Sequence, residues 1–453
     1  MSFKKEFAWG AATASFQIEG AITEDGKGLS VWDVLSHKKG FVEDNHTGDV
    51  ACDHYHRFKE DVQLMKQMGL KAYRFSVSWP RVLPNGIGKV NEKGLGFYDQ
   101  LVDELLANGI EPYVTLFHWD FPNELFLRGD FLNPDSSDWF AEYTKVVVER
   151  LSDRVTNWMT LNEPQCYAIL GHEVGQHAPG LSMAQPYVLQ VIHNMLLAHG
   201  KAVQVIRKYA KKKPVIGYAP VFGYIAPRTD SKEDICLAKE AMFRCTEEAG
   251  FGFSEPWWNT PIYKGHYPED GLKLWGQWLP KIGQDDMKTI CQPLDFFGFN
   301  FYRSAVTAGY QDGKPDLGVV HKVGHPQTAF DWEVTPEGFY HVVKALYERY
   351  ELPLCITENG LANQDWVSLD GKVHDPQRID FLHRYLKSLK KAASEGVDVM
   401  GYMHWSLMDN FEWASGYNKR FGLIYVDYET QNRILKDSAY WYKTVIETNG
   451  ECL

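Results

Sequence analysis

Thr160-Leu161-Asn162-Glu163-Pro164 and Ile356-Thr357-Glu358-Asn359-Gly360 are the two stretches that decide the fold of this 453-residue chain. Each ends an apolar, β-branched run with a glutamate, and a Pro or Gly then breaks the strand. A carboxyl group at the tip of a buried strand sits on a rigid element and faces a cleft. Two such groups, brought together by the fold, can act as an acid and a nucleophile on one bond.

Outward from these stretches, short apolar runs alternate with amphipathic helical patterns, which indicates βα units and a parallel sheet. Eight candidate strands can be found, the number that a closed (β/α)8 barrel requires. They span residues 7–12, 72–77, 112–117, 155–161, 214–219, 295–299, 354–357 and 397–403. We therefore predict an α/β fold in which residues 1–453 form a single (β/α)8 TIM barrel domain. Extended βα loops should surround a cleft at its C-terminal face.

Apolar stripes with helical spacing lie between these strands. Phe58, Val62 and Met65 form one, and Tyr98, Leu101, Val102 and Leu105 form another that Asn108-Gly109 ends. A third stripe follows Asp375-Pro376 and consists of Ile379, Leu382, Leu386 and Leu389. Residues 220–294 are too many for one helix and two short loops. We interpret them as an insertion that covers one side of the cleft.

The composition excludes several classes of partner. A net charge of −12 and a pI near 5.7 argue against nucleic acid or an anionic membrane surface. No apolar run approaches the ~18 residues that span a bilayer, and the N-terminus does not resemble a signal peptide. The seven cysteines are scattered without a CxxC pair, which is typical of a reducing compartment. We expect a cytoplasmic protein without a cofactor, and the oligomeric state stays open.

Polar and aromatic residues end at least seven of the eight predicted strands. They are Gln17, Arg74, His118-Trp119, Asn162-Glu163, Asn300 with Tyr302, Glu358-Asn359 and Trp405. Because the carboxyl ends of barrel strands meet at one rim, these side chains should converge. Any one of them has an ordinary structural explanation, but their convergence favours a polar cleft. The 15 tryptophans add flat apolar faces of the kind that suit sugar rings.

Six motifs in order give the chain a resemblance to glycoside hydrolase family one, the β-glucosidase and β-galactosidase family. They lie at residues 7–20 (FAWGAATASFQIEG), 74–81 (RFSVSWPR), 116–120 (LFHWD), 160–164 (TLNEP), 356–360 (ITENG) and 405–413 (WSLMDNFEW). The resemblance extends over essentially the whole chain. It implies a retaining β-glycosidase that acts by double displacement, since a pair of carboxyl groups is what glycoside hydrolysis uses.

The resemblance implies a role for each matching residue. Glu163 would be the general acid/base and Glu358 the nucleophile, with Arg74 and Tyr302 orienting Glu358. Asn162 would contact the sugar 2-hydroxyl, and Trp405 would stack beneath the ring. The remaining substrate-binding residues would be Gln17, His118, Trp119, Asn300, Tyr302, Trp332, Glu412, Trp413 and Phe421. Of these, Asn300 and Trp332 would lie nearer the aglycone. The implied substrate is a small β-glycoside with a terminal nonreducing glucosyl residue, as in cellobiose or an aryl or alkyl glucoside. The resemblance does not distinguish activity on glucosides from activity on galactosides or fucosides.

The loop at residues 412–421 bears on an alternative, a 6-phospho-β-glycosidase. Relatives that act on phosphosugars place Ser, Lys and Tyr where this chain has Glu412, Lys419 and Phe421. Only the lysine matches. A negative Glu412 would repel a phosphate dianion, at a cost of ~1 kcal/mol at 4 Å in water. A sugar without phosphate is therefore the main prediction.

The sequence argues against two other classes of protein, a sugar-binding pseudoenzyme and a metalloenzyme. A sugar-binding pseudoenzyme would lack one of the two glutamates, and both are present. A metalloenzyme is suggested by Asp53-His54-Tyr55-His56 and by residues 171–177 (GHEVGQH). However, neither pair of histidines has the i, i+4 spacing that places both on one helix face. We interpret these histidines as structural and predict no metal requirement.

Overall fold

The computed structural model describes residues 3–319 and 323–453. Eight strands form the central sheet, in the order β5-β4-β3-β2-β1-β11-β10-β7, and every neighbouring pair is parallel. The strands are β1 (Ala8–Ala12), β2 (Ala72–Ser76), β3 (Glu111–Phe117), β4 (Asn157–Asn162), β5 (Val215–Ala219), β7 (Phe297–Asn300), β10 (Leu354–Asn359) and β11 (Val399–Trp405). Each predicted strand is confirmed, with ends that differ by one or two residues.

The two edges of this sheet meet, so that it forms a nearly closed barrel. The Asp295 amide donates to the Ile216 carbonyl at 2.8 Å, and the Asn300 amide donates to the Pro220 carbonyl at 2.8 Å. These bonds join the segment around β7 to the segment around β5. The (β/α)8 barrel is confirmed, and the carboxyl ends of its strands meet at one rim.

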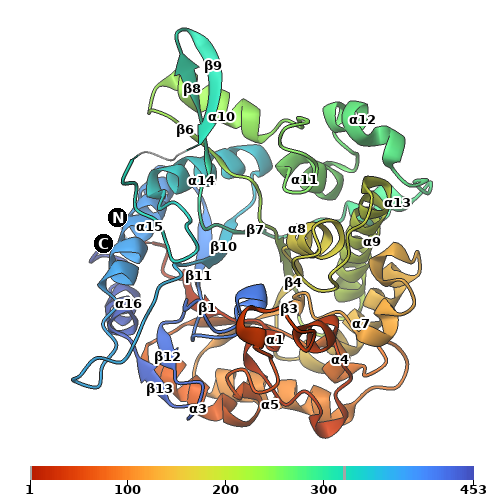
Figure 1. Cartoon of the computed structure of the whole chain (residues 1–453), viewed down its shortest axis with the longest axis vertical. Helices are drawn as coiled ribbons and strands as arrows, with labels where there is room; N and C mark the ends of the chain where they lie inside the picture. Colours follow the sequence, from red (N-terminus) through yellow and green to blue (C-terminus); the bar gives the residue numbers. More distant parts are fainter. Residues whose placement is uncertain (1–2, 320–322) are drawn as a thin grey trace.

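Helices surround the barrel (Figure 1). The longer ones are α3 (His54–Gln67), α5 (Glu92–Ala107), α7 (Ser136–Leu151), α9 (Gln185–Tyr209), α14 (Pro336–Tyr350), α15 (Pro376–Ser394) and α16 (Asp437–Glu447). In α15, Leu382, Leu386 and Leu389 are buried as the apolar stripe predicts. Proline at the first helical position starts this helix because its fixed φ suits the first turn. The N- and C-terminal segments lie together, where the Asn449 amide group donates to the Phe3 carbonyl at 2.8 Å.

Shorter elements build the loops at the rim. The short helices are α1 (Ser15–Ile18), α2 (Val31–Ser36), α4 (Trp79–Val82), α6 (Asn123–Phe126) and α8 (Pro164–Ala168). The strands β12 (Ile424–Val426) and β13 (Arg433–Leu435) pair after β11. Among the described residues, no helix is both long and apolar enough to cross a membrane.

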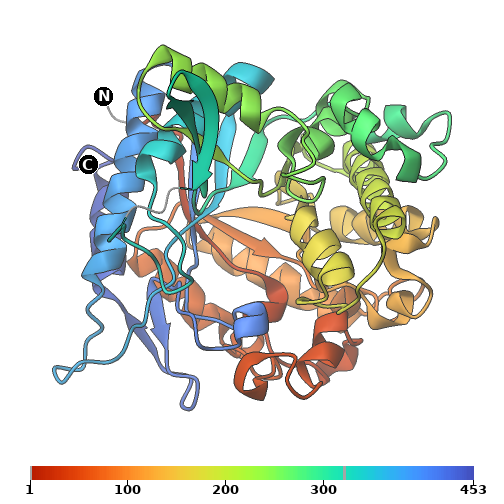
Figure 2. The same ribbon diagram turned by 45° about the horizontal axis from the view of Figure 1, so that its top comes forward.

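The predicted insertion folds on one side of the barrel (Figure 2). It contains β6 (Ile225–Pro227), α10 (Lys232–Met242), α11 (Glu255–Lys264), α12 (Glu269–Trp275) and α13 (Asp286–Ile290). The sequence analysis missed β6 and the hairpin of β8 (Val306–Gln311) and β9 (Lys314–Val319). These three strands form a small sheet outside the barrel, where short polar segments carry little alternating apolar pattern.

Candidate active site

The rim of the barrel encloses a cavity of about 630 Å³, which is large enough for a disaccharide-sized ligand. Ten of the predicted site residues line it: His118, Trp119, Glu163, Tyr302, Trp332, Glu358, Trp405, Glu412, Trp413 and Phe421. The other four, Gln17, Arg74, Asn162 and Asn300, are fully buried behind this surface and bond to residues that line it. The structure thus brings all the predicted residues to one place.

Glu358 ends β10 with both carboxyl oxygens held. Arg74 Nη1 donates to Oε1 at 2.6 Å, and the Tyr302 hydroxyl donates to Oε2 at 2.7 Å. Burial raises the pKa of Glu358, while the Arg74 guanidinium and the Tyr302 hydroxyl act to lower it. Because a fixed positive charge favours the ionised form, the Arg74 contact opposes the effect of burial on Glu358.

Glu163 follows β4 in a left-handed conformation, with φ 37° and ψ 60°. Such a backbone is costly for a residue other than Gly and is concentrated at functional sites. Asn300 Nδ2 donates to Oε1 at 2.8 Å, and the Cys166 thiol donates to Oε2 at 3.2 Å. Burial and the charge of Glu358 raise the pKa of Glu163 to about 8. Glu163 is therefore largely protonated at neutral pH.

The amide of Asn162 fixes the protonation of His118. Asn162 Oδ1 accepts from Arg74 at 2.6 Å and from Asn300 at 3.1 Å, so its Nδ2 faces His118 Nε2 at 2.9 Å. That nitrogen of His118 must then accept, which leaves the ring proton on Nδ1. Burial lowers the pKa of His118 far below its usual value, so the ring is neutral. Within the described chain Nδ1 has no partner, and it is free to donate to a ligand hydroxyl.

Gln17 supplies the complementary acceptor. Its Nε2 donates to Asn410 Oδ1 at 3.0 Å and to the Phe411 carbonyl at 2.8 Å, and it lies 3.4 Å from Glu412 Oε2. Its Oε1 is buried and finds no partner among the residues that the structure describes. Since a buried polar atom without a partner is costly, this oxygen and His118 Nδ1 are suited to the hydroxyls of a bound sugar.

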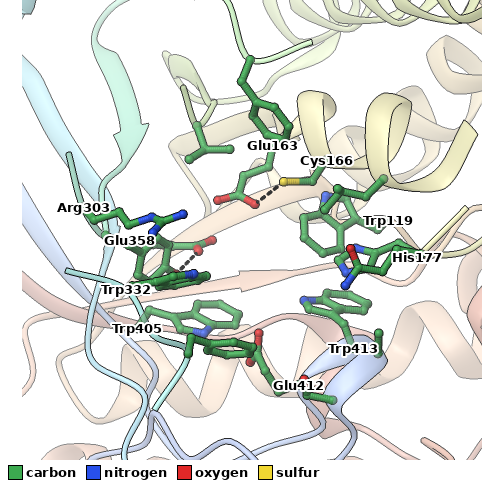
Figure 3. Close-up of a pocket in the computed structure, with 18 of the residues that line it drawn as sticks. Trp119, Glu163, Cys166, His177, Arg303, Trp332, Glu358, Trp405, Glu412 and Trp413 are labelled. Carbon is green, nitrogen blue, oxygen red and sulfur yellow. Dashed lines mark hydrogen bonds between the residues drawn. The ribbon is translucent and has the colours of Figure 1, made fainter. Parts of the chain in front are cut away.

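The carboxyl group of Glu412 faces the cavity across Trp405 from Glu163 (Figure 3). Burial, together with the charges of Glu358 and Glu163, raises the pKa of Glu412 to about 8. Glu412 is therefore largely neutral at pH 7. It would repel a phosphate group less than its sequence position alone suggests. The position of Lys419 is the stronger argument against a phosphosugar. Its Nζ donates to the Ala329 carbonyl at 2.7 Å, and Lys419 does not line the cavity.

A buried ion cluster holds the loop that carries Glu412, Trp413 and Phe421. Asp409 accepts from Lys436 and from Arg420, each at 2.6 Å, and from the Gly422 amide at 2.9 Å. The His404 ring contacts the Phe421 carbonyl at 3.2 Å from the neighbouring strand. These bonds fix both ends of the loop, so that its cavity residues lie on a rigid support.

Aromatic rings form much of the cavity surface. Trp119 and Trp413 lie with ring centroids 4.4 Å apart, and His118 lies 5.8 Å from Trp405 in a stacked arrangement. On the other side, Phe330 stacks on Trp332 at 4.9 Å. Flat apolar faces of this kind can contact the C–H face of a sugar ring, and they exclude water from the two carboxyl groups.

The sequence analysis missed several cavity residues. Val221, Phe222, Gly223, Tyr224 and Phe253 come from the insertion, which therefore covers one side of the cavity as predicted. Cys166, Leu170, Gln176 and His177 come from the segment after Glu163, and Arg303, Ala305 and Phe330 from the loop after β7. Cys166 could have been found from its place three residues after Glu163, one turn along a helix that Pro164 starts.

Three of the four histidines that suggested a metal site, His54, His56 and His172, pair with carboxyl groups. His54 is buried and pairs with Asp61 at 2.8 Å. His172 contacts Asp130 at 3.2 Å, while His177 lines the cavity. Across residues 3–319 and 323–453, no group of three or more His, Cys, Asp or Glu side chains is arranged to hold a metal ion.

This arrangement defines a class of enzyme, because a carboxyl group bonded to an arginine and a second, largely protonated carboxyl group face one sugar-sized cavity, as glycoside hydrolysis requires. The sequence profile of glycosyl hydrolase family 1 matches residues 1–451. Beta-glucosidase A of Thermotoga maritima is 48% identical over 450 residues, which cover 99% of this chain and 98% of that protein. Its solved structure superimposes with a TM-score of 0.90 and covers 99% of each chain at 46% identity. The chain belongs to glycosyl hydrolase family 1.

A relative with a different printed activity also matches. The aryl-phospho-beta-D-glucosidase BglC of Bacillus subtilis is 39% identical over 485 residues, which cover 100% of this chain and 98% of that protein. Beta-glucosidase A of Acetivibrio thermocellus is 44% identical and covers 99% of each chain. Family membership alone therefore does not separate plain glucosides from phosphorylated ones.

Proposed function

We propose that this protein is a retaining β-glucosidase, which releases terminal nonreducing β-D-glucosyl residues from cellobiose-like oligosaccharides or from aryl and alkyl glucosides. The observation that carries the proposal is the difference between the two buried glutamates. Glu358 is bonded to Arg74 and Tyr302, whereas the donors to Glu163 among the described residues, Asn300 and Cys166, are neutral. The names of the two beta-glucosidases above support the same activity.

In the first step, the ionised Glu358 attacks the anomeric carbon and Glu163 gives its proton to the departing oxygen. A covalent glucosyl-enzyme forms on Glu358, and the aglycone leaves with the proton of Glu163. Because the charge on Glu358 is now gone, the main electrostatic cause of the raised pKa of Glu163 is removed. Glu163 can then act as a base toward water, which attacks the same carbon and releases glucose with its configuration retained.

Three contacts would bind the glucosyl unit. Asn162 lies next to Glu163 and would meet the 2-hydroxyl, a contact that strengthens in the transition state. His118 Nδ1 and Gln17 Oε1 supply the unpaired donor and acceptor for hydroxyls further round the ring. Glu412, Trp413 and Trp405 complete this subsite, and Trp332, Phe421 and the insertion would face the aglycone. Asn300 holds Glu163 from behind, so its contribution to the aglycone site stays a prediction.

We further propose that one domain of residues 1–453 carries this activity in the cytoplasm, as part of the breakdown of cellulose-derived sugars. The seven cysteines are free, and four of them, Cys52, Cys166, Cys245 and Cys355, are buried. That state is typical of a reducing compartment.

Initial rates on a panel of nitrophenyl β-glycosides test this function. We expect kcat/KM for the plain β-glucoside to exceed that for the 6-phospho-β-glucoside by at least about tenfold, because Lys419 does not line the cavity and Arg303, which does, is already bonded to Glu333. The β-galactoside, the β-fucoside and cellobiose complete the panel, and the α-glucoside is the negative control. A faster reaction with the 6-phosphorylated substrate would instead assign the phospho-glycosidase activity.

A further inference from the structure

Cys166 is the one cavity residue that contacts a carboxyl group of the reaction and has no part in the mechanism above. Its Sγ lies 3.2 Å from Glu163 Oε2, and the contact is visible in Figure 3. The side chain is only 8% exposed, and it lines the cavity beside Leu170 and His177.

The local backbone explains why this thiol reaches the carboxyl group. Glu163 is the residue that precedes α8, Pro164 is its first residue, and Cys166 occupies the third position of the helix. The Cys166 amide donates to the Glu163 carbonyl at 2.9 Å, which closes a tight turn. Residues three apart lie on one face of such a turn, so the thiol lies beneath the carboxyl group that it contacts.

The two oxygens of Glu163 have partners of different kinds. Asn300 Oδ1 accepts from the Thr357 hydroxyl at 2.6 Å, so its Nδ2 can only donate to Glu163 Oε1. A thiol is both a weak donor and a weak acceptor. The partner of Oε2 can therefore reverse its direction, whereas the partner of Oε1 cannot.

We propose that Cys166 is a positioning residue for the acid/base, and that its thiol keeps hold of Glu163 Oε2 in both protonation states of the carboxyl group. This inference rests on the proposed function of Glu163. When Oε2 carries the catalytic proton, the sulfur can accept that hydrogen. When the proton has passed to the departing oxygen, the S–H group donates to the bare carboxylate. The thiol proton itself stays on sulfur throughout.

The chemistry of the thiol suits this role. Burial and the nearby charge of Glu163 raise the pKa of Cys166 well above its usual value, so that it remains a neutral S–H group at working pH. A weak donor favours the carboxylate only slightly. A stronger donor would stabilise the carboxylate and lower the pKa of Glu163. A smaller fraction of the enzyme would then carry the proton that the first step needs.

Other groups also act on Glu163 and must stay unchanged in a test. The charged ones are Glu358 and Arg74, and Tyr224, Tyr302 and Glu412 lie within electrostatic range. The variants Cys166→Ala, Cys166→Val and Cys166→Ser leave all of them in place. Alanine and valine remove the donor but differ in volume, while serine keeps a donor and strengthens it.

The test is the pH dependence of kcat/KM for cellobiose, whose alkaline limb reports the loss of the acid proton from free enzyme. Removing the donor destabilises the carboxylate, so Cys166→Ala and Cys166→Val should both move this limb to higher pH by about half a pH unit. Cys166→Ser should move it to lower pH. Cys245→Ala is the control, because it removes another buried thiol, which contacts the Ser254 hydroxyl. This variant should leave the alkaline limb in place.

The outcomes separate the two proposals. If the unmodified enzyme cleaves cellobiose and the three Cys166 variants leave the limb unchanged, or shift it in the same direction, the thiol fills space only and the role proposed for Cys166 is wrong. The function of Glu163 would still stand in that case. If the unmodified enzyme lacks β-glucosidase activity, both proposals fail.

Discussion

Replacement of Glu358 by glycine is expected to lower kcat for an aryl β-glucoside by about 10⁴-fold or more, because the group that forms the covalent bond is lost. Arg74 and Tyr302 keep their places but no longer have a carboxylate to hold. Added azide should restore part of the activity, since a small anion can occupy the space that the side chain leaves. Azide should attack the anomeric carbon from the face that Glu358 uses in the unmodified enzyme, which gives the α-glucosyl azide. This product is identified by NMR spectroscopy.

Glu255→Gln is the matched control for this variant. Glu255 is also buried and hydrogen-bonded, to Asn259 at 2.8 Å, but it does not line the cavity. We expect that control to change kcat by less than about tenfold. A Glu358→Gly enzyme that keeps a tenth of the activity without azide, and still melts cooperatively, would show that another residue is the nucleophile.

Replacement of Glu163 by alanine should produce a loss that depends on the leaving group. For a phenyl or alkyl glucoside, the first step needs the acid, and kcat/KM should fall by about 10²–10⁴-fold. For a dinitrophenyl glucoside, the departing oxygen is already stable as an anion, so kcat/KM should change little. The second step lacks its base, however, and the glucosyl-enzyme should accumulate with a low kcat and a low KM.

The pH profile gives a second reading of the same variant. Burial and the charge of Glu358 raise the pKa of Glu163, so the acid form is present below that pKa and is lost as the pH rises through it. The alkaline limb of kcat/KM for phenyl glucoside should therefore disappear in Glu163→Ala. Equal losses on all leaving groups, with the limb unchanged, would remove Glu163 from the acid role.

The barrel could be predicted from the sequence because each strand is a short, apolar run between helical patterns. The exact ends of the strands could not be predicted, because they depend on which residues of the neighbouring strand are available for backbone hydrogen bonds and not on hydrophobicity. β11 continues to His404 and Trp405, since Trp405 pairs with Ala12 of β1. The β8–β9 hairpin was missed because it lies outside the barrel core.

The predicted site residues converge on one cavity, but the way in which they support one another was not predictable. The contact between the Asn300 amide and Glu163 was not expected from the sequence. The charge of Glu412 was expected to oppose phosphate, whereas burial and the neighbouring Glu358 and Glu163 raise its pKa to about 8. Both effects depend on distances between strands that are far apart in sequence, which no local pattern records.

The most direct measurement of the central claim is the identification of the residue that carries the sugar in the covalent intermediate. A 2-deoxy-2-fluoro-β-glucoside with a dinitrophenyl leaving group should slow the second step more than the first and trap the glucosyl-enzyme. Intact mass should show one sugar per chain, and peptide mass spectrometry should place it on Glu358 in the segment Ile356-Thr357-Glu358-Asn359-Gly360. A label on Glu163 or Glu412, or turnover without any trapped intermediate, would contradict the assignment of the two glutamates.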